Sequence, residues 1–209
     1  MILHKTDIEN QERKYRLNLI NSITGIKPAN LIGTKSLTGK ENLAIFSSVV
    51  HLGSNPGLLG FILRPTGEVP RHTHENILET EYYTINSIPL KLAKNAHYTS
   101  AKFDKEINEF ERCKIEAHYL EDFKAPFVKE SSIRIGLKLQ DQVPIKINQT
   151  ALIIGSIETL EISENVLDRS GYINLDKAEI AGISGLNSYY KLSLKHQFPY
   201  ARVNETPEF

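Results

Sequence analysis

Two histidines in the sequence have the spacing of metal ligands. His72 and His74 are two residues apart, with Glu75 beside them. Imidazole rings and carboxylates are common zinc ligands, and on a strand this spacing would turn both rings to one side. Thr73, however, is a residue type that favours a helix N-cap, and a helix start would point the two rings in different directions. No third ligand cluster stands out, so the sequence favours surface histidines and predicts no metal site.

Glycine-rich segments come close to three other functional motifs without matching them. Five residues separate Gly33 from Gly39, where a phosphate loop needs four, and Glu41 stands where such a loop has a magnesium-binding Ser or Thr. The glycines of segment 53–60 lack the spacing of a dinucleotide fingerprint. Segment 182–186 lacks the second glycine of a nucleophile elbow. A nucleotide triphosphatase, a dinucleotide-binding Rossmann domain and a serine hydrolase are therefore not favoured.

The single cysteine offers a further candidate nucleophile. Cys113 lies between Arg112 and Lys114, whose positive charges would lower a thiol pKa. One cysteine forms neither an internal disulfide nor a cysteine-rich zinc site. Without a partner pattern, a packing residue is the favoured interpretation, and no thiol mechanism is predicted.

Composition narrows the possible partners. The chain has 209 residues, with 25 basic and 25 acidic side chains and a formal net charge of zero. Nucleic acids and anionic membranes attract an excess of positive charge, so neither is an expected partner. No secretory hydrophobic region accompanies the charged residues of segment 1–16, and no apolar run has membrane-spanning length. The cytoplasm is therefore the expected location.

The elements that must position any site are mostly strands. Strand-like runs are expected at 30–35, 42–50, 58–63, 82–86, 133–140, 150–162 and 189–194, with a strong turn signal at 53–57. Gly155 is expected to mark a bulge or a close approach. A helix should begin at Thr73, and weaker helical patterns cover 90–99 and 105–112. The pattern predicts one mainly β domain over 1–209, a barrel or a sandwich with peripheral helices.

The order of several sequence blocks resembles the flavin reductase-like family of FMN-binding split barrels. These blocks are Lys27–Thr34, Gly39–Val50, Gly60–Pro65, Arg71–Ile77 and Tyr83–Asn86, followed by Tyr98–Ala101, Asn108–Phe110, Ala125–Ser131 and Phe198–Arg202. The resemblance covers about residues 17–202. It implies a split β-barrel of the Greek-key type with short peripheral helices, assembled as a homodimer with FMN in a groove at or near the subunit interface.

The resemblance also implies a set of cofactor-binding residues. Small and polar side chains near strand ends would contact the ribityl chain and the ring edge, Ala44 and Val49 would contact the ring, and Arg64, Arg71 and the helix start at Thr73 would hold the phosphate. The full expected set is Thr34, Lys35, Ser36, Asn42, Ala44, Ser47, Ser48, Val49, Arg64, Arg71, Thr73 and Asn76.

One departure from the family pattern concerns His72. The family often has a Lys-Asp-Thr triplet ahead of the helix, whereas this chain has Arg71, His72 and Thr73. The positive charge and the hydroxyl are kept, and the aspartate is replaced. His72 therefore receives no role from the sequence. His97, beside Tyr98 and Thr99, has two interpretations, a residue that faces the flavin or its reductant and a residue on a helix surface, and no catalytic role is predicted for it.

The activity that the resemblance implies is hydride or electron transfer through bound FMN, with NAD(P)H as a transient donor. Such a reaction requires no side-chain acid or base, because the cofactor supplies the chemistry, and no catalytic residue is predicted. A non-catalytic FMN-binding protein, acting as electron carrier, flavin store or sensor, fits the same residues. A β-barrel interaction module without flavin is the third interpretation.

Overall fold

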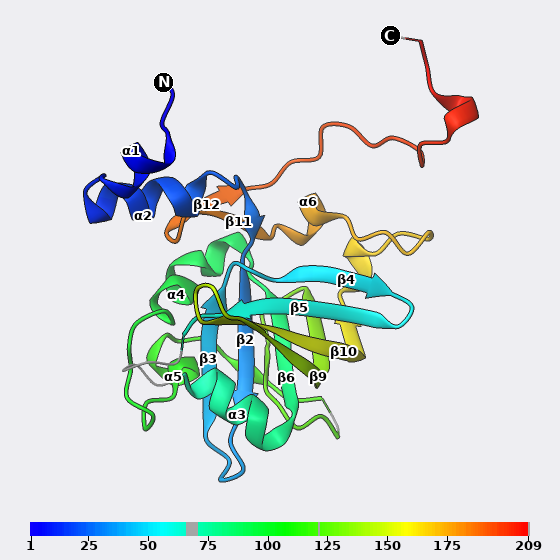
Figure 1. The fold of residues 1–209 in the computed structure, drawn as a ribbon. Helices are drawn as coiled ribbons and strands as arrows, with labels where there is room; N and C mark the ends of the chain where they lie inside the picture. The colour runs from blue at the N-terminus through cyan, green and yellow to red at the C-terminus, as the bar shows by residue number, and fades with distance from the viewer. Residues whose placement is uncertain (66–70, 121, 209) are drawn as a thin grey trace.

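The computed structural model describes residues 1–65, 71–120 and 122–208, and its centre is one antiparallel sheet (Figure 1). Seven strands form it, in the order β3-β2-β6-β9-β10-β5-β4. Their bounds are β2 Asn30–Lys35, β3 Glu41–Phe46, β4 Val50–Ser54, β5 Gly57–Leu63, β6 Tyr82–Ser87, β9 Ile133–Ile145 and β10 Thr150–Ile162. The predicted mainly β class and the split-barrel architecture are confirmed.

The connection between β3 and β4 explains why this sheet curls into a barrel. These two strands lie at opposite edges of the sheet, yet only residues 47–49 separate them in the chain. An extended chain covers at most about 3.6 Å per residue, so the two edges must approach each other at this point. The predicted strand 42–50 is wrong in this respect, because β3 ends at Phe46 and the chain turns across the barrel before β4 begins.

Both faces of the sheet are covered by apolar side chains. Inside the barrel, Phe61 and Tyr83 pack edge to face within a cluster of buried residues that includes Ile77 of helix α3 (His72–Thr80). On the outer face, Leu31 and Leu43 pack in a second cluster, together with side chains from the helices and from the C-terminal strands. Because side chains on both faces of β2 are covered, its residues form a nearly continuous buried run instead of alternating between buried and exposed.

Gly155 lies where β10 shifts its register against β9, as the sequence predicts. A Cβ at this position would lie 2.2 Å from the hydroxyl oxygen of Tyr83, so only glycine lets the strand pass this buried ring. The predicted bulge and the predicted close approach are therefore both present.

Helix α3 begins two residues earlier than expected, because its N-cap is Arg71 and not Thr73. The helix covers His72–Thr80 with Arg71 at the N-cap position, so Thr73 lies inside the first turn and is not the cap. Its hydroxyl instead accepts a hydrogen bond from the side chain of Asn42 on β3 at 2.9 Å. The prediction that Thr73 caps this helix is wrong, because its side chain is already paired with the neighbouring strand.

Shorter elements complete the fold. They are β1 Lys27–Pro28, the 3₁₀ turn Leu90–Leu92, α4 Ala93–Tyr98, α5 Glu109–Arg112, β7 Ala117–His118, β8 Phe127–Val128, the 3₁₀ turn Glu164–Val166, α6 Leu175–Ala178, β11 Ala181–Ser184 and β12 Ser188–Lys191. Strands β1, β11 and β12 make a small second sheet. The predicted helices at 90–99 and 105–112 are present in shortened form, and the last predicted strand ends at Lys191.

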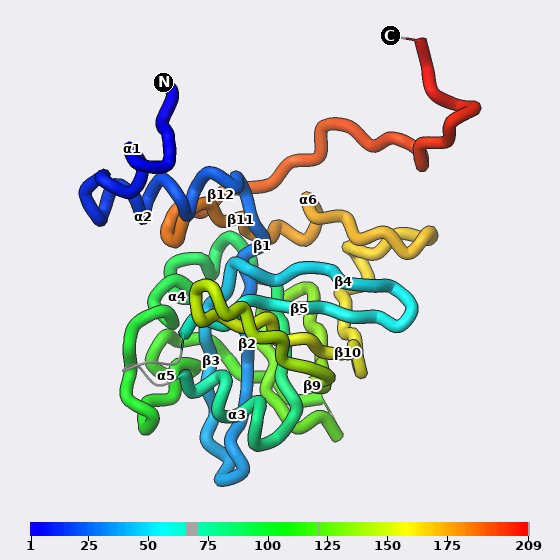
Figure 2. The backbone as a smooth tube through the Cα atoms, viewed as in Figure 1, coloured from blue at the N-terminus to red at the C-terminus, as the bar shows by residue number. Residues whose placement is uncertain are grey.

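The two ends of the chain lie outside the barrel. Helices α1 (Lys5–Glu9) and α2 (Arg13–Ser22) lie beside the small sheet, and the segment after β12 runs away from the body as far as a 3₁₀ turn at Val203–Glu205 (Figure 2). Within the described parts of the chain, none of the helices has both the length and the apolar character that crossing a membrane requires.

Candidate functional site

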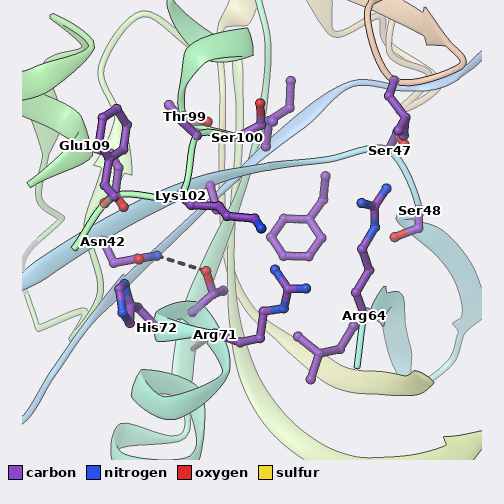
Figure 3. Close-up of a pocket in the computed structure, with 18 of the residues that line it drawn as sticks. Asn42, Ser47, Ser48, Arg64, Arg71, His72, Thr99, Ser100, Lys102 and Glu109 are labelled. Atoms are coloured by element: carbon purple, nitrogen blue, oxygen red, sulfur yellow. Dashed lines mark hydrogen bonds between the residues drawn. The ribbon is translucent and has the colours of Figure 1, made fainter. Parts of the chain in front are cut away.

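A large cleft opens where the barrel meets its peripheral elements (Figure 3). Its volume is about 960 Å³, at the upper end of the range of roughly 300–1,000 Å³ usual for cofactor and ligand sites. One wall, which we call the strand wall, comprises residues 42–48, the end of β5 at 62–64 and the start of α3. The other, which we call the loop wall, comprises residues 99–105 and Glu109.

The strand wall is rigid and largely apolar at its middle. Ala44, Phe46 and Ile62 line the cleft, and the Phe46 ring packs edge to face on the buried Phe61. The hydroxyl of Ser48 accepts a hydrogen bond from the backbone N–H of Ile62 at 3.1 Å and donates to its carbonyl at 3.3 Å. Ser48 therefore fixes the connection to β5, and its hydroxyl is occupied by backbone groups.

The start of α3 gives the cleft a positive end. No side chain among the described residues caps this helix, and the first N–H groups of any helix have no acceptor within it. Arg71 lies at the N-cap position and Thr73 in the first turn, and both line the cleft. Because Asn42 donates to the Thr73 oxygen, the hydroxyl hydrogen remains available to a ligand. Free N–H groups, the helix dipole and a cation together favour an anion.

The loop wall adds charges that the sequence analysis did not identify. Figure 3 shows Lys102 extending from the loop into the part of the cleft that Arg71 reaches from the other side. Among the described residues, neither of these two cations pairs with a carboxylate. Lys105 does pair, with Glu75 of α3, at 2.6 Å. The block Tyr98–Ala101 was part of the family resemblance, but no periodic pattern indicated that the following residues face a ligand.

One acidic side chain of the loop wall is buried. Glu109 is only 5% exposed, and one carboxylate oxygen accepts a hydrogen bond from the backbone N–H of Leu43 at 3.1 Å. Burial raises the pKa of this carboxyl above its ordinary value. The side chain connects the first turn of α5 to β3, and it lines the cleft next to the positive end.

The structure brings seven of the twelve expected cofactor-binding residues to this cleft. They are Asn42, Ala44, Ser47, Ser48, Arg64, Arg71 and Thr73. His72, which received no role from the sequence, also lines it. His97 lies outside the lining and its ring contacts the Tyr189 hydroxyl at 3.2 Å.

The other five expected residues make contacts within the fold. Asn76 donates to the hydroxyl of Thr34 at 3.0 Å, and this buried pair holds α3 against β2. Ser36 accepts from the backbone N–H of Lys40 in the turn between β2 and β3. The Lys35 ammonium lies 4.6 Å above the ring of Tyr119.

The fifth, Val49, packs against the core cluster inside the barrel, and it is not part of the cleft lining. Among the described residues, no group of three or more His, Cys, Asp or Glu side chains is arranged to hold a metal ion.

A comparison with protein-family models matches residues 26–179 to the flavin reductase like domain. This match covers most of the chain, including the whole seven-stranded sheet and the loop wall. The chain belongs to the flavin reductase-like family. Asn21, Ile183 and Leu186 lie outside the matched range and still line the cleft, so this member completes its cleft with residues beyond the common domain.

Solved structures of flavin reductase-like proteins have the same fold. A split-barrel protein from Shewanella frigidimarina NCIMB 400, assigned as a flavin reductase, is 43% identical, with a TM-score of 0.92 over 96% of this chain and 100% of that one. Nitrilotriacetate monooxygenase component B from Bacillus cereus is 18% identical, with a TM-score of 0.82 over 95% and 98% of the two chains. Flavoredoxin of Desulfovibrio vulgaris (Miyazaki F) is 20% identical, with a TM-score of 0.73 over 84% and 92%.

Proposed function

We propose that this flavin reductase-like protein is an FMN-dependent oxidoreductase that accepts reducing equivalents from NAD(P)H. The family assignment supports a flavin as the ligand. The observation that carries the choice of FMN is the composition of the cleft, which joins an anion-binding end to an apolar wall. A flavin mononucleotide has the same two parts, a phosphate dianion and a flat ring.

The phosphate fits the start of α3. The helix N-terminus, Arg71, Lys102 and the Thr73 hydroxyl supply N–H, cationic and O–H donors within one end of the cleft. Arg64 adds a second guanidinium at the end of β5. Phosphate oxygens accept from all of these donors, and guanidinium groups match their geometry. Of the residues expected from the sequence, Arg64, Arg71 and Thr73 keep their proposed phosphate role, and Lys102 joins them.

The ring fits the strand wall. Ala44, Phe46 and Ile62 offer an apolar surface, and Ser47 lies beside them with a hydroxyl that bonds to no other described side chain or backbone group. Bound FMN would supply the redox chemistry. The protein holds the ring against this wall and tunes it through nearby donors and positive charge, so that no acid or base from the chain is required.

The donor binds without a dedicated domain in this proposal. The sequence contains no dinucleotide fingerprint, so NAD(P)H would enter the open side of the cleft and leave after each transfer. We further propose a homodimer. Support for it comes from exposed apolar side chains of Leu17 and Ile20 on α2 and of Ile23 at its C-cap, and from Phe198 and Tyr200 of the C-terminal segment. Light scattering coupled to gel filtration tests this state.

Flavin titration of the purified protein is the decisive experiment. We expect saturable quenching of FMN fluorescence, weaker binding of riboflavin because it lacks the phosphate, and a melting temperature that rises with FMN concentration by mass action. We also expect NADH or NADPH oxidation above the rate with free FMN alone. Tight binding without that oxidation would identify the non-catalytic electron carrier instead. Absence of FMN binding would contradict both alternatives.

A further inference from the structure

The ion pair between Glu75 and Lys105 occupies an unusual position for a surface contact. Glu75 lies in the first turn of α3 and lines the cleft, next to the donors proposed to hold the phosphate. A carboxylate at this place would repel a phosphate dianion. Lys105 lines the cleft from the opposite side, and its ammonium lies 2.6 Å from the Glu75 carboxylate.

Both partners remain ionised and their charges cancel. The hydrogen bond from Lys105 holds the pKa of Glu75 below its ordinary value, and the hydrogen bond to Glu75 raises the pKa of Lys105. The titratable neighbours of the pair are His72 and His74 on the side of Glu75, and Glu79 and Glu106 on the side of Lys105. Glu106 is in turn paired with Lys40. The pair therefore removes the one negative charge that α3 presents to the phosphate end.

The pair also joins the two walls of the cleft. Glu75 belongs to α3 on the strand wall, whereas Lys105 ends the segment that carries Lys102. A second ion pair, Lys40 with Glu106, holds the same segment to the turn before β3, and neither of its residues lines the large cleft. Segment 99–106 is thus held by one ion pair inside the cleft, through Lys105, and by one outside it, through Glu106.

We infer that the Glu75–Lys105 pair is a specificity element for phosphorylated flavin, which cancels the charge of Glu75 where the phosphate binds. The inference rests on the proposed function, because it requires FMN with its phosphate at the start of α3. It assigns Lys105 a role distinct from that of Lys102. Lys102 attracts the phosphate directly, whereas Lys105 acts through Glu75.

The test is a double-mutant cycle read by fluorescence titration with FMN and riboflavin. Lys105→Met should weaken FMN binding about tenfold, since an uncompensated carboxylate within several ångströms of a dianion costs on the order of 1 kcal/mol in a solvent-exposed site. Glu75→Gln should bind FMN at least as tightly as the wild type. The double variant should return to within about threefold of the wild type, because both charges are gone. Riboflavin affinity should stay constant throughout.

A matched control distinguishes the effect of the Glu75 charge on FMN binding from the effect of losing an ion pair that holds the segment in place. Lys40→Met breaks the ion pair outside the cleft and should leave FMN affinity within about twofold of the wild type, because exposed pairs contribute little to stability. The inference is overturned if the double variant stays as weak as Lys105→Met, if riboflavin weakens in parallel, or if Lys40→Met loses FMN equally. A wild-type protein that binds riboflavin as tightly as FMN would instead overturn the proposed phosphate site itself, before any variant is measured.

Discussion

The two walls of the cleft are built from different kinds of contact. The strand wall is fixed by backbone hydrogen bonds and core packing, as the bond between Ser48 and Ile62 and the contact of Phe46 with Phe61 show. The loop wall is largely exposed, and among the contacts that hold it and the adjoining Glu106 to the barrel are the ion pairs Lys105–Glu75 and Glu106–Lys40 and the buried Glu109 carboxyl. In the proposed function, the strand wall therefore provides a rigid surface for the flavin ring, and the exposed loop wall provides an adjustable segment for the phosphate charge.

The largest expected effect comes from filling the strand wall. Ser47→Leu places a bulky side chain against the apolar surface proposed for the ring, and we expect FMN affinity to fall by about two orders of magnitude, since a rigid wall relaxes little around an added side chain. Ser47 is preferable to Ser48, whose replacement would also break two hydrogen bonds to Ile62. Circular dichroism should show an intact fold.

A serine-to-leucine substitution in the loop wall tests whether the two walls differ in rigidity. Ser100 lines the cleft and is exposed, and its hydroxyl donates a hydrogen bond to the carbonyl of His97 near the end of α4. Ser100→Leu should reduce FMN affinity by no more than about threefold, because an exposed segment can shift. Equal losses for the two variants would show that the walls do not differ in rigidity.

The next largest effect concerns charge. Lys102→Met should weaken FMN binding about tenfold, because a charge-assisted contact to phosphate contributes roughly 1.5 kcal/mol or more. Riboflavin binding should not change. Arg64→Met, at the exposed end of β5, should cost less, about threefold. Isothermal titration with both flavins measures each value. A larger loss for Arg64→Met would place the phosphate at the β5 end rather than at the start of α3.

The strand wall is built from regular strands and the loop wall is not, and this difference explains which parts of the fold and the site could be predicted from the sequence. Strands carry local patterns, and the bounds of β2 and β10 agree with the predicted 30–35 and 150–162. Five of the seven expected ligand residues in the cleft belong to β3 or directly follow β3 or β5, and the other two, Arg71 and Thr73, lie at the predicted helix start. Lys105 and Glu109 were missed because their place depends on contacts with α3 and β3, which are distant in the chain. Lys102 lies in the same segment as Lys105 and was missed with it.

The expected ligand residues that lie outside the cleft lining have a related physical explanation. Thr34 and Asn76 are of the right type for binding a cofactor, yet they bind each other across 42 positions of the chain. Hydroxyl and amide side chains satisfy one another as readily as they satisfy a ligand, and the sequence does not reveal which partner they find. Helices α1 and α2 were not predicted either, since α2 buries none of its residues and so lacks a core-facing pattern.

A smaller effect is expected from the buried acid of the loop wall. Glu109 has a raised pKa in the folded protein, so in the range above 4.5 the unfolded chain releases this proton first and stability falls as pH rises. Glu109→Gln removes that dependence. Its free energy of unfolding relative to the wild type should therefore increase from pH 4 to pH 8, measured by urea denaturation at each pH. A constant difference across this range would show that the carboxyl titrates normally.

The smallest effect is expected at the only cysteine. Cys113 is 7% exposed and packs in the outer core cluster, and burial raises the pKa of its thiol despite the neighbouring Arg112. A buried neutral thiol is a poor nucleophile, and Cys113 does not line the cleft. Cys113→Ser should leave FMN affinity and NAD(P)H oxidation within about twofold of the wild type, with a modest loss of stability because a hydroxyl replaces a packed sulfur. A much larger loss of turnover at unchanged FMN affinity would mean that electrons pass through the Cys113 thiol. The proposed ring-binding and charge-binding walls would then not account for the whole reaction.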